Sequence, residues 1–185
     1  MSTLEKAIQY SRNSFANGEF IQRLGSLIEI VTDSKGSVSA QVLREYYTKG
    51  LFNIFEELGI KSKIIDNPIN DKPPFLIGTR IESPEYKTIL FYGHGDTVPL
   101  QTGDWYEGIN PSELKVIGDK IYGRGVADNK GQHFINLMAL LSVLKTKKKL
   151  GFNLKLIFEM GEEIGSPGLF DLCELYKEDL KSDVL

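Results

Sequence analysis

The chain has 185 residues, 41% hydrophobic and 25% charged, which is typical of a globular protein and leaves room for one domain with a single core. Its formal net charge of −3 argues against nucleic acid or an anionic membrane as the main partner. The single cysteine, Cys173, excludes a disulfide within the chain and a zinc-thiolate cluster; because the sequence shows neither a secretory signal nor a long apolar run, we expect a cytoplasmic protein.

Apolar residues at helical spacing predict the elements of the N-terminal third. The stripe over residues 4–30 is interrupted at Asn17 and Gly18, which predicts two short helices. A second stripe, from Leu43 to Leu58, is followed by Gly59. This pattern predicts one helix of about five turns that ends at the glycine.

Short apolar and β-branched runs follow, and they predict strands at residues 63–65, 75–81 and 88–92. Residues 89–92 are all apolar, as in a strand covered on both faces. Further elements are expected along the rest of the chain: a hairpin of residues 114–117 and 120–122, a helix over 134–144, a strand over 152–158, and a helix with Ser166 as N-cap and Pro167 in its first turn. Strands alternating with helices predict an α/β fold with a layered sheet.

Three polar clusters lie at the ends of predicted strands or at the start of a helix, where open α/β sheets place their sites. The first, GHGDTVP, holds His94 and Asp96, so the carboxylate can orient the imidazole as partners of metal-bound histidines do. The second, GRGVADNKG, holds Asp128, which would repel a phosphate and so argues against a nucleotide loop. The third, EMGEEIGSPG, holds the adjacent Glu162 and Glu163, whose repulsion a cation would relieve.

Each cluster alone also has a plainer interpretation. The alternatives are a turn with a solvated His and Asp, an acid that stabilises a helix N-terminus, and two exposed acids on a surface loop. Together the clusters supply oxygen and nitrogen donors suited to zinc, cobalt or manganese, namely His94, Asp96, Asp128, Glu162 and Glu163. Two-metal hydrolytic sites use a bridging carboxylate, and Asp128 is the candidate bridge.

In this order and spacing, the three motifs resemble the signatures of the co-catalytic zinc amidohydrolase and metallopeptidase family, which includes acetylornithine deacetylase, succinyl-diaminopimelate desuccinylase, aminoacylase, glutamate carboxypeptidase and carnosine-type dipeptidases. The segments ADNKGQ and GEEIGSPGL are most similar to the dipeptidase-like branch. The resemblance implies a three-layer α/β/α sandwich with a mostly parallel mixed sheet. It also implies a hydrolase with two Zn²⁺ ions, or Co²⁺ or Mn²⁺, that cleaves the amide bond of a dipeptide or an N-acyl amino acid.

The resemblance further implies a role for each site residue. His94 ligates one zinc ion, and Asp96 orients its imidazole. Asp128 bridges both metals, Glu162 is the general base, and Glu163 ligates the second zinc ion. The peptide bond after Asp128 is often cis in this family.

Members of the family need two further ligands, an acidic residue shortly beyond a segment resembling residues 182–185 and a histidine near the far C-terminus. They also have an inserted lid domain that mediates homodimerisation. Because residues 1–185 contain none of these, we expect them to be the N-terminal part of a longer catalytic domain and to be inactive alone. The alternative function is a metal-free relative that binds a peptide or amino acid; the presence of Glu162 argues against it, because a binding protein needs no base.

Several other residues have structural interpretations. His133 is expected to be structural or close to the substrate rather than a ligand. Trp105 and Tyr106 are expected to pack rather than to line a pocket. Cys173 lies on the apolar stripe of a helix and is expected to be an inert core thiol.

Overall fold

The computed structural model describes residues 1–36 and 38–185. Its helices are α1 (Thr3–Ala16), α2 (Glu19–Glu29), α3 (Ala40–Glu45), α4 (Phe52–Glu57), α5 (Lys130–Lys147), α6 (Leu169–Leu175) and α7 (Lys177–Leu180). Its strands are β1 (Lys61–Ile65), β2 (Phe75–Arg80), β3 (Thr88–His94), β4 (Lys115–Ile117), β5 (Lys120–Tyr122) and β6 (Asn153–Glu159). Among these residues, no helix combines the length and the hydrophobicity that a membrane span requires.

The first two helices confirm the predicted break. Ser2 and Glu5 form a reciprocal capping box at the start of α1, which satisfies two backbone donors that a helix end leaves free. Gly18 adopts a left-handed conformation, with φ of 83°, and α2 begins directly after it. A glycine is favoured at this position because a Cβ would be strained there.

The predicted helix of residues 43–58 is interrupted by a π-helical turn, Tyr46–Leu51, between α3 and α4. The wider turn changes which side chains face inward, and the neighbouring residues Tyr46 and Tyr47 are both fully buried. The Tyr47 hydroxyl lies 3.1 Å from the carbonyl oxygens of Pro74 and Phe158, to which it can donate. Tertiary contacts of this kind leave no trace in the apolar spacing, so the sequence predicted a regular helix.

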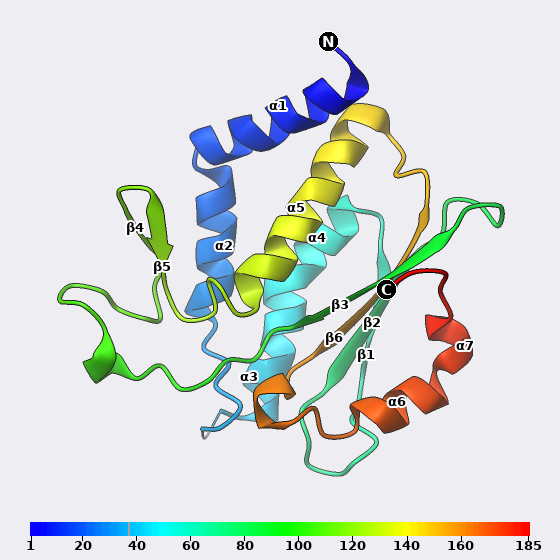
Figure 1. Ribbon diagram of the computed structural model, residues 1–185. Coiled ribbons are helices and arrows are strands. Elements are labelled where there is room, and N and C mark those ends of the chain that lie inside the picture. The colour runs from blue at the N-terminus through cyan, green and yellow to red at the C-terminus, as the bar shows by residue number, and fades with distance from the viewer. Residues whose placement is uncertain (37) are drawn as a thin grey trace.

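The main sheet has the strand order β1-β2-β6-β3 (Figure 1). The expected mixed sheet is confirmed, but the expectation that it is mostly parallel is wrong for these four strands. β3 and β6 are parallel, because α5 crosses between them, whereas β1 pairs antiparallel with β2 and β2 pairs antiparallel with β6. A short loop rather than a crossover helix joins β1 to β2, which requires antiparallel pairing.

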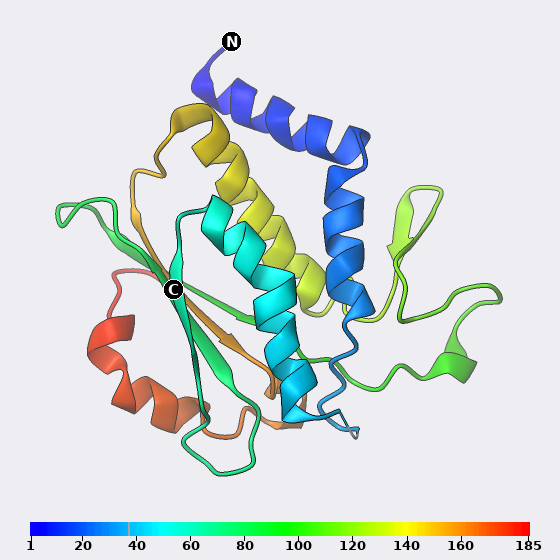
Figure 2. The ribbon, with the colours of Figure 1, turned by 180° about the vertical axis from the view of Figure 1, so that it is seen from behind.

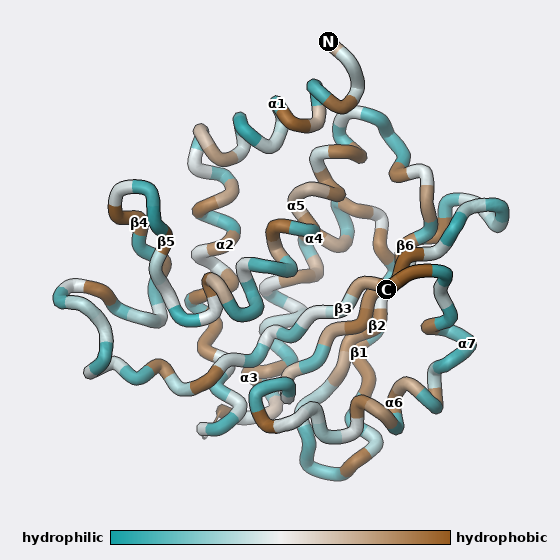
Figure 3. Tube along the Cα trace, in the orientation of Figure 1, coloured by the Kyte–Doolittle hydropathy of each residue, from teal (hydrophilic) through white to brown (hydrophobic). Residues whose placement is uncertain are grey.

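The three-layer arrangement is confirmed. Helices α1, α2, α4 and α5 lie on one side of the sheet, and α6 and α7 lie on the other (Figures 1 and 2). The larger core joins α2, α4 and α5 to Leu76, Leu156 and Phe158, and the smaller core joins α6 and α7 to Phe75 and Ile157. The apolar strands stand out between polar surface segments in Figure 3.

β3 is less covered than its apolar sequence predicted. Ile89, Leu90 and Phe91 are only half-buried, and Tyr92 is 37% exposed. The outer edge of this strand meets residues 183 and 184, where Leu90 N–H donates to the Val184 carbonyl at 2.8 Å. A single β-bridge therefore borders β3 on this side.

The helix predicted to start at Ser166 begins later. α6 starts at Leu169, and Gly168 is its N-cap in a left-handed conformation. The Ser166 hydroxyl instead donates to the Glu159 carboxylate at 2.8 Å. This side chain is thus used at the end of β6 rather than at a helix terminus.

Candidate metal centre

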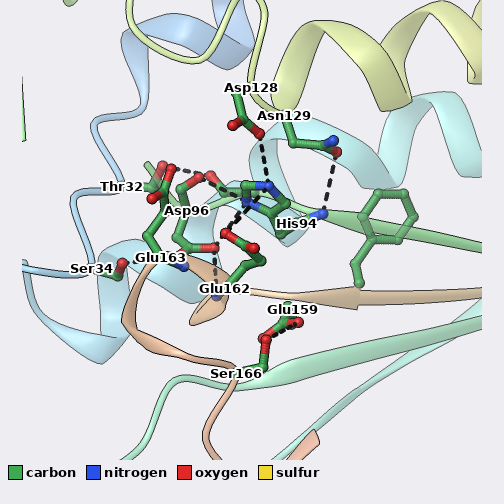
Figure 4. Close-up of polar contacts among 12 residues, drawn as sticks. Thr32, Ser34, His94, Asp96, Asp128, Asn129, Glu159, Glu162, Glu163 and Ser166 are labelled. Atoms are coloured by element: carbon green, nitrogen blue, oxygen red, sulfur yellow. Dashed lines mark hydrogen bonds and ion pairs between the residues drawn. The ribbon is translucent and has the colours of Figure 1, made fainter. Parts of the chain in front are cut away.

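The carboxyl ends of the parallel strands β3 and β6 lie at the same edge of the sheet, and this edge gathers the predicted polar clusters. His94 is the last residue of β3, and Asp96 follows it. Glu162 and Glu163 form a 3₁₀ turn directly after β6, and Asp128 stands just before α5. Figure 4 shows His94 between Asp96, Asp128 and Glu162.

The His94 imidazole contacts carboxylates through both ring nitrogens. Nδ1 lies 3.3 Å from Asp96 Oδ1 and 3.2 Å from the Asp96 carbonyl oxygen. Nε2 lies 3.0 Å from Asp128 Oδ1 and 3.9 Å from Glu162 Oε2. Because both ring nitrogens face acceptor oxygens, both can donate hydrogen bonds when the imidazole is protonated.

The charges around His94 determine its pKa. Burial of the imidazole lowers the pKa. The hydrogen bond to Asp96 and the negative charges of Asp96, Glu162 and Asp128 raise it by more, and the pKa is about 9 as a result. At neutral pH the metal-free ring therefore carries a positive charge. A metal ion in this place would replace a proton on Nε2.

Asp96 is completely buried, and its carboxylate accepts hydrogen bonds from other groups besides His94. Its Oδ1 accepts the backbone N–H of Glu162 at 3.2 Å, and its Oδ2 accepts the N–H of Glu163 at 3.1 Å. Oδ2 also accepts the hydroxyl of Ser34 at 2.7 Å. One carboxylate therefore connects the ends of β3 and β6 and the segment that follows α2.

Three carboxylates at the open side of His94 concentrate negative charge. The Asp128 side chain is 69% exposed, that of Glu162 is 44% exposed and that of Glu163 is 16% exposed. Burial and the charges of Asp128, Glu162 and Asp96 raise the pKa of Glu163. Lys35 Nζ, at 3.9 Å from Glu163 Oε2, is a cation close to this group.

A chain of hydrogen bonds through Asn129, His133 and Tyr46 supports the loop of Asp128. The peptide bond between Asp128 and Asn129 is cis. Asn129 Oδ1 accepts the N–H of His94 at 3.4 Å and lies 3.1 Å from His133 Nδ1. His133 Nε2 lies 2.6 Å from the Tyr46 hydroxyl, so Nδ1 donates and Nε2 accepts.

His133 is therefore a buried structural residue rather than one of the groups that face the carboxylates. Burial, together with the charges of His94 and Lys130, lowers its pKa to about 3. The ring is neutral, and Phe158 packs edge-on against it with centroids 5.0 Å apart. This position agrees with the structural role expected from the sequence.

Lys130 is a support that sequence reasoning missed. Its ammonium group is buried and donates to the carbonyl oxygens of Leu27 and Ile30, at 3.0 and 2.6 Å. It therefore satisfies free carbonyls at the end of α2. Burial lowers its pKa to about 7. A lysine after a helix-initiating Asp-Asn pair normally indicates a solvated side chain, so the sequence carried no signal of this role.

Ser34 was also missed, because a Thr-Asp-Ser run after a helix is typical of any surface turn. Trp105 behaves as expected for a packing residue: its Nε1–H donates to the Leu100 carbonyl at 2.8 Å, and the Arg124 guanidinium lies 5.4 Å from its ring. The same prediction is wrong for Tyr106, which is 79% exposed. Cys173 is partly buried, and burial raises the pKa of its thiol, which agrees with an inert thiol.

The donor chemistry of the cluster fits a divalent metal ion. Two atoms that bind one tetrahedral zinc ion are about 3.4 Å apart, and His94 Nε2 and Asp128 Oδ1 are 3.0 Å apart. Among the residues that the structure describes, however, no three His, Cys, Asp or Glu side chains are already placed around one point as a metal site. The described residues thus offer part of a ligand set.

Comparison with known proteins agrees with this arrangement. The chain is 30% identical to human Beta-Ala-His dipeptidase, with 98% of the chain and 37% of the relative covered. It is 32% identical to the Cys-Gly metallodipeptidase DUG1 of Candida albicans, with 83% and 34% covered. The chain thus spans little more than a third of the length of these relatives.

A solved structure shows the same fold. Human carnosine dipeptidase 1 matches with a TM-score of 0.83 and 30% identity, over 97% of this chain and 39% of that one. Residues 90–185, which contain all three motifs, match the model of peptidase family M20/M25/M40. The resemblance noted in the sequence is confirmed, and the chain belongs to this peptidase family.

Proposed function

We propose that residues 1–185 are the N-terminal part of the catalytic domain of a zinc-dependent dipeptidase. The observation that carries this proposal is the convergence of His94, Asp128, Glu162 and Glu163 at the carboxyl ends of β3 and β6. The neighbouring carboxylates raise the pKa of Glu163, and a divalent cation would relieve their mutual repulsion. Membership of a peptidase family gives that cation a hydrolytic use.

In this proposal, His94, Asp128 and Glu163 hold the metal, with Asp128 shared between two ions. Zinc in such a site polarises a peptide carbonyl and acidifies water. Glu162 is the general base: its carboxylate takes the proton of the attacking water and passes it to the leaving amine. Its position suits that task, because it lies beside His94 Nε2 at 3.9 Å and remains partly exposed to solvent.

The site needs more ligands than these three. Catalytic zinc usually has three protein ligands, so two ions that share Asp128 require further donors. We propose that these lie outside the 185 residues, as does a lid domain that mediates homodimerisation. The 185 residues alone are then expected to bind zinc weakly and to be inactive. The cytoplasmic location stays a prediction of the sequence.

Two relatives support a dipeptide as the substrate in this proposal. One is a Beta-Ala-His dipeptidase and another a Cys-Gly metallodipeptidase, which favours dipeptides over N-acyl amino acids. The test uses the full-length protein with zinc, a panel of dipeptides that includes both of these, and matched N-acetyl amino acids. Turnover of dipeptides that a chelator abolishes and zinc restores is the expected result.

Two outcomes would contradict the proposal. Turnover restricted to N-acyl amino acids would assign a deacylase. Binding of peptide without turnover, unchanged by chelator, would assign the metal-free binding protein. A Glu162→Gln variant serves as the inactive control, because it removes the base while keeping the shape of the side chain.

A further inference from the structure

The segment after α2 forms a short parallel ladder with the loop after β3. Thr97 N–H donates to the Thr32 carbonyl at 3.0 Å, and Ser34 N–H donates to the Thr97 carbonyl at 3.2 Å. The buried Thr32 hydroxyl donates to the Gly95 carbonyl at 2.6 Å. These bonds fix the backbone of residues 32–34 beside Asp96.

This ladder places the Ser34 hydroxyl against the buried Asp96 carboxylate, at 2.7 Å from Oδ2. It is the shortest of the hydrogen bonds that Asp96 accepts, and hydroxyl donors to carboxylates are strong. Among residues 1–36 and 38–185, no Lys or Arg side chain forms an ion pair with Asp96; the charged partner there is His94. The Ser34 hydroxyl, two backbone N–H groups and the His94 imidazole therefore surround the buried carboxylate.

The direction of the Asp96 carboxylate matters for two groups at once. Oδ1 faces the His94 imidazole and the N–H of Glu162, while Oδ2 faces the N–H of Glu163. If the carboxylate rotates, the histidine loses its partner and the turn of the two glutamates loses two anchors. The Ser34 hydroxyl is the side-chain donor that opposes this rotation.

We propose that Ser34 is a positioning residue of the metal site, which acts through Asp96 on the His94 ring and on the Glu162–Glu163 turn. This role rests on the proposed function of the site. Groups that orient metal ligands in this way typically change metal affinity by 10–100-fold when they are removed. Within the described part of the chain, the hydrogen bonds of Ser34 go to Asp96 and Thr97.

The test compares three variants of the full-length protein. Ser34→Ala removes the hydroxyl, and Ser34→Thr keeps it. Ser39→Ala is the matched control: this nearby serine caps α3 through Val42 N–H, so its loss weakens the fold without touching Asp96. Two quantities are measured, the zinc affinity by competition with a chelating dye, and the hydrogen–deuterium exchange of the Glu162 and Glu163 amides in the metal-free protein.

Ser34→Ala is expected to weaken zinc binding by roughly tenfold or more and to speed exchange of both amides, while Ser34→Thr restores both within about threefold and Ser39→Ala changes neither. Unchanged amide exchange in Ser34→Ala, or an equal loss of zinc affinity in Ser39→Ala, would overturn the role of Ser34. Absence of zinc binding in the unmodified protein would instead overturn the proposed function. The amide exchange of Glu162 and Glu163 would still show whether Ser34 stabilises the Glu162–Glu163 turn.

Discussion

The pKa values of the two buried histidines at this site are shifted in opposite directions. Carboxylates surround His94, and their charge outweighs the cost of burying an imidazolium, so its pKa rises to about 9. His133 faces a hydroxyl, an amide oxygen and an aromatic ring, and burial lowers its pKa to about 3. The partners of each ring therefore suit one histidine to exchange a proton for a metal and the other to hold the loop of Asp128.

The low pKa of His133 predicts how its removal alters the pH dependence of stability. Between the ordinary pKa near 6.5 and the folded value of about 3, the unfolded chain binds a proton that the folded chain does not, so stability falls as the pH falls. By pH 5 this amounts to about 2 kcal/mol. A His133→Gln variant is less stable at pH 7 but lacks this particular loss.

Urea unfolding at pH 7 and pH 5 measures the effect. The free energy of unfolding of the unmodified chain is expected to drop more than that of His133→Gln. Other acids titrate equally in both proteins and cancel in the comparison. Parallel pH profiles for the two proteins would show that His133 is protonated in the folded state.

The adjacent glutamates are predicted to fail in different ways. In the full-length protein, Glu162→Gln is expected to keep its metal and to lose about 10²–10⁴-fold in turnover, because a general base is removed. Glu163→Ala is expected to lose metal, because a ligand is removed. Metal analysis of both purified variants separates the roles, and equal metal content would refute the assignment.

At the scale of elements, the sequence patterns predicted part of each described strand and the helices other than α7, and the errors have physical causes. The π turn arises because Tyr46 and Tyr47 each find buried polar partners, on α5 and on the sheet. Ser166 caps no helix because Glu159 binds its hydroxyl. Such partners lie far away in the sequence, so a local pattern cannot indicate them.

In the candidate site, too, the sequence indicated the residues within motifs but not the residues that the fold brings to them. Its motifs stand at the ends of elements and contain chemically unusual pairs of residues, which made His94, Asp128 and Glu163 visible in the sequence. Their supports were not visible: Ser34 and Lys130 reach the site only through the fold, one by the ladder beside Thr97 and the other through the end of α2. A serine in a turn and a lysine near a helix start are common on any surface.

At the start of α5, Gly131 packs closely against the preceding loop. A Cβ on Gly131 would overlap the carbonyl oxygen of Val126, and Gly131 N–H donates to the Gly125 carbonyl at 3.0 Å. Gly131→Ala is therefore expected to destabilise the chain by about 1–3 kcal/mol, although helix propensity alone predicts a gain of about 1 kcal/mol. Chemical denaturation measures the sign.

Gly103→Ala is the control for this substitution. No atom lies within 4 Å of a Cβ at that position, so its change in stability is expected to stay within about 0.5 kcal/mol. A stabilised Gly131→Ala variant would show that α5 does not dock on the loop of residues 123–128 as described.

At the scale of the whole molecule, the fold explains why three distant motifs form one centre. Parallel pairing of β3 with β6 places His94 opposite Glu159, just before the Glu162–Glu163 turn. Helix α5 begins beside Asp128 at this edge and leads the chain to the other end of the sheet, from which β6 returns. The helices of the larger core pack on one face of the sheet, and α6 and α7 pack on the other (Figures 1 and 2). The open side carries the exposed carboxylates, where a substrate and further ligands can approach.

In the proposed metal site, this edge of the sheet binds zinc through His94, Asp128 and Glu163. Anomalous diffraction at the zinc edge, on crystals of the full-length protein grown with Zn²⁺, is the most direct test. Two peaks are expected, one beside His94 Nε2 and one beside the Glu163 carboxylate, with Asp128 between them. Zinc bound elsewhere, or an ordered crystal with no peak within reach of His94, would contradict it.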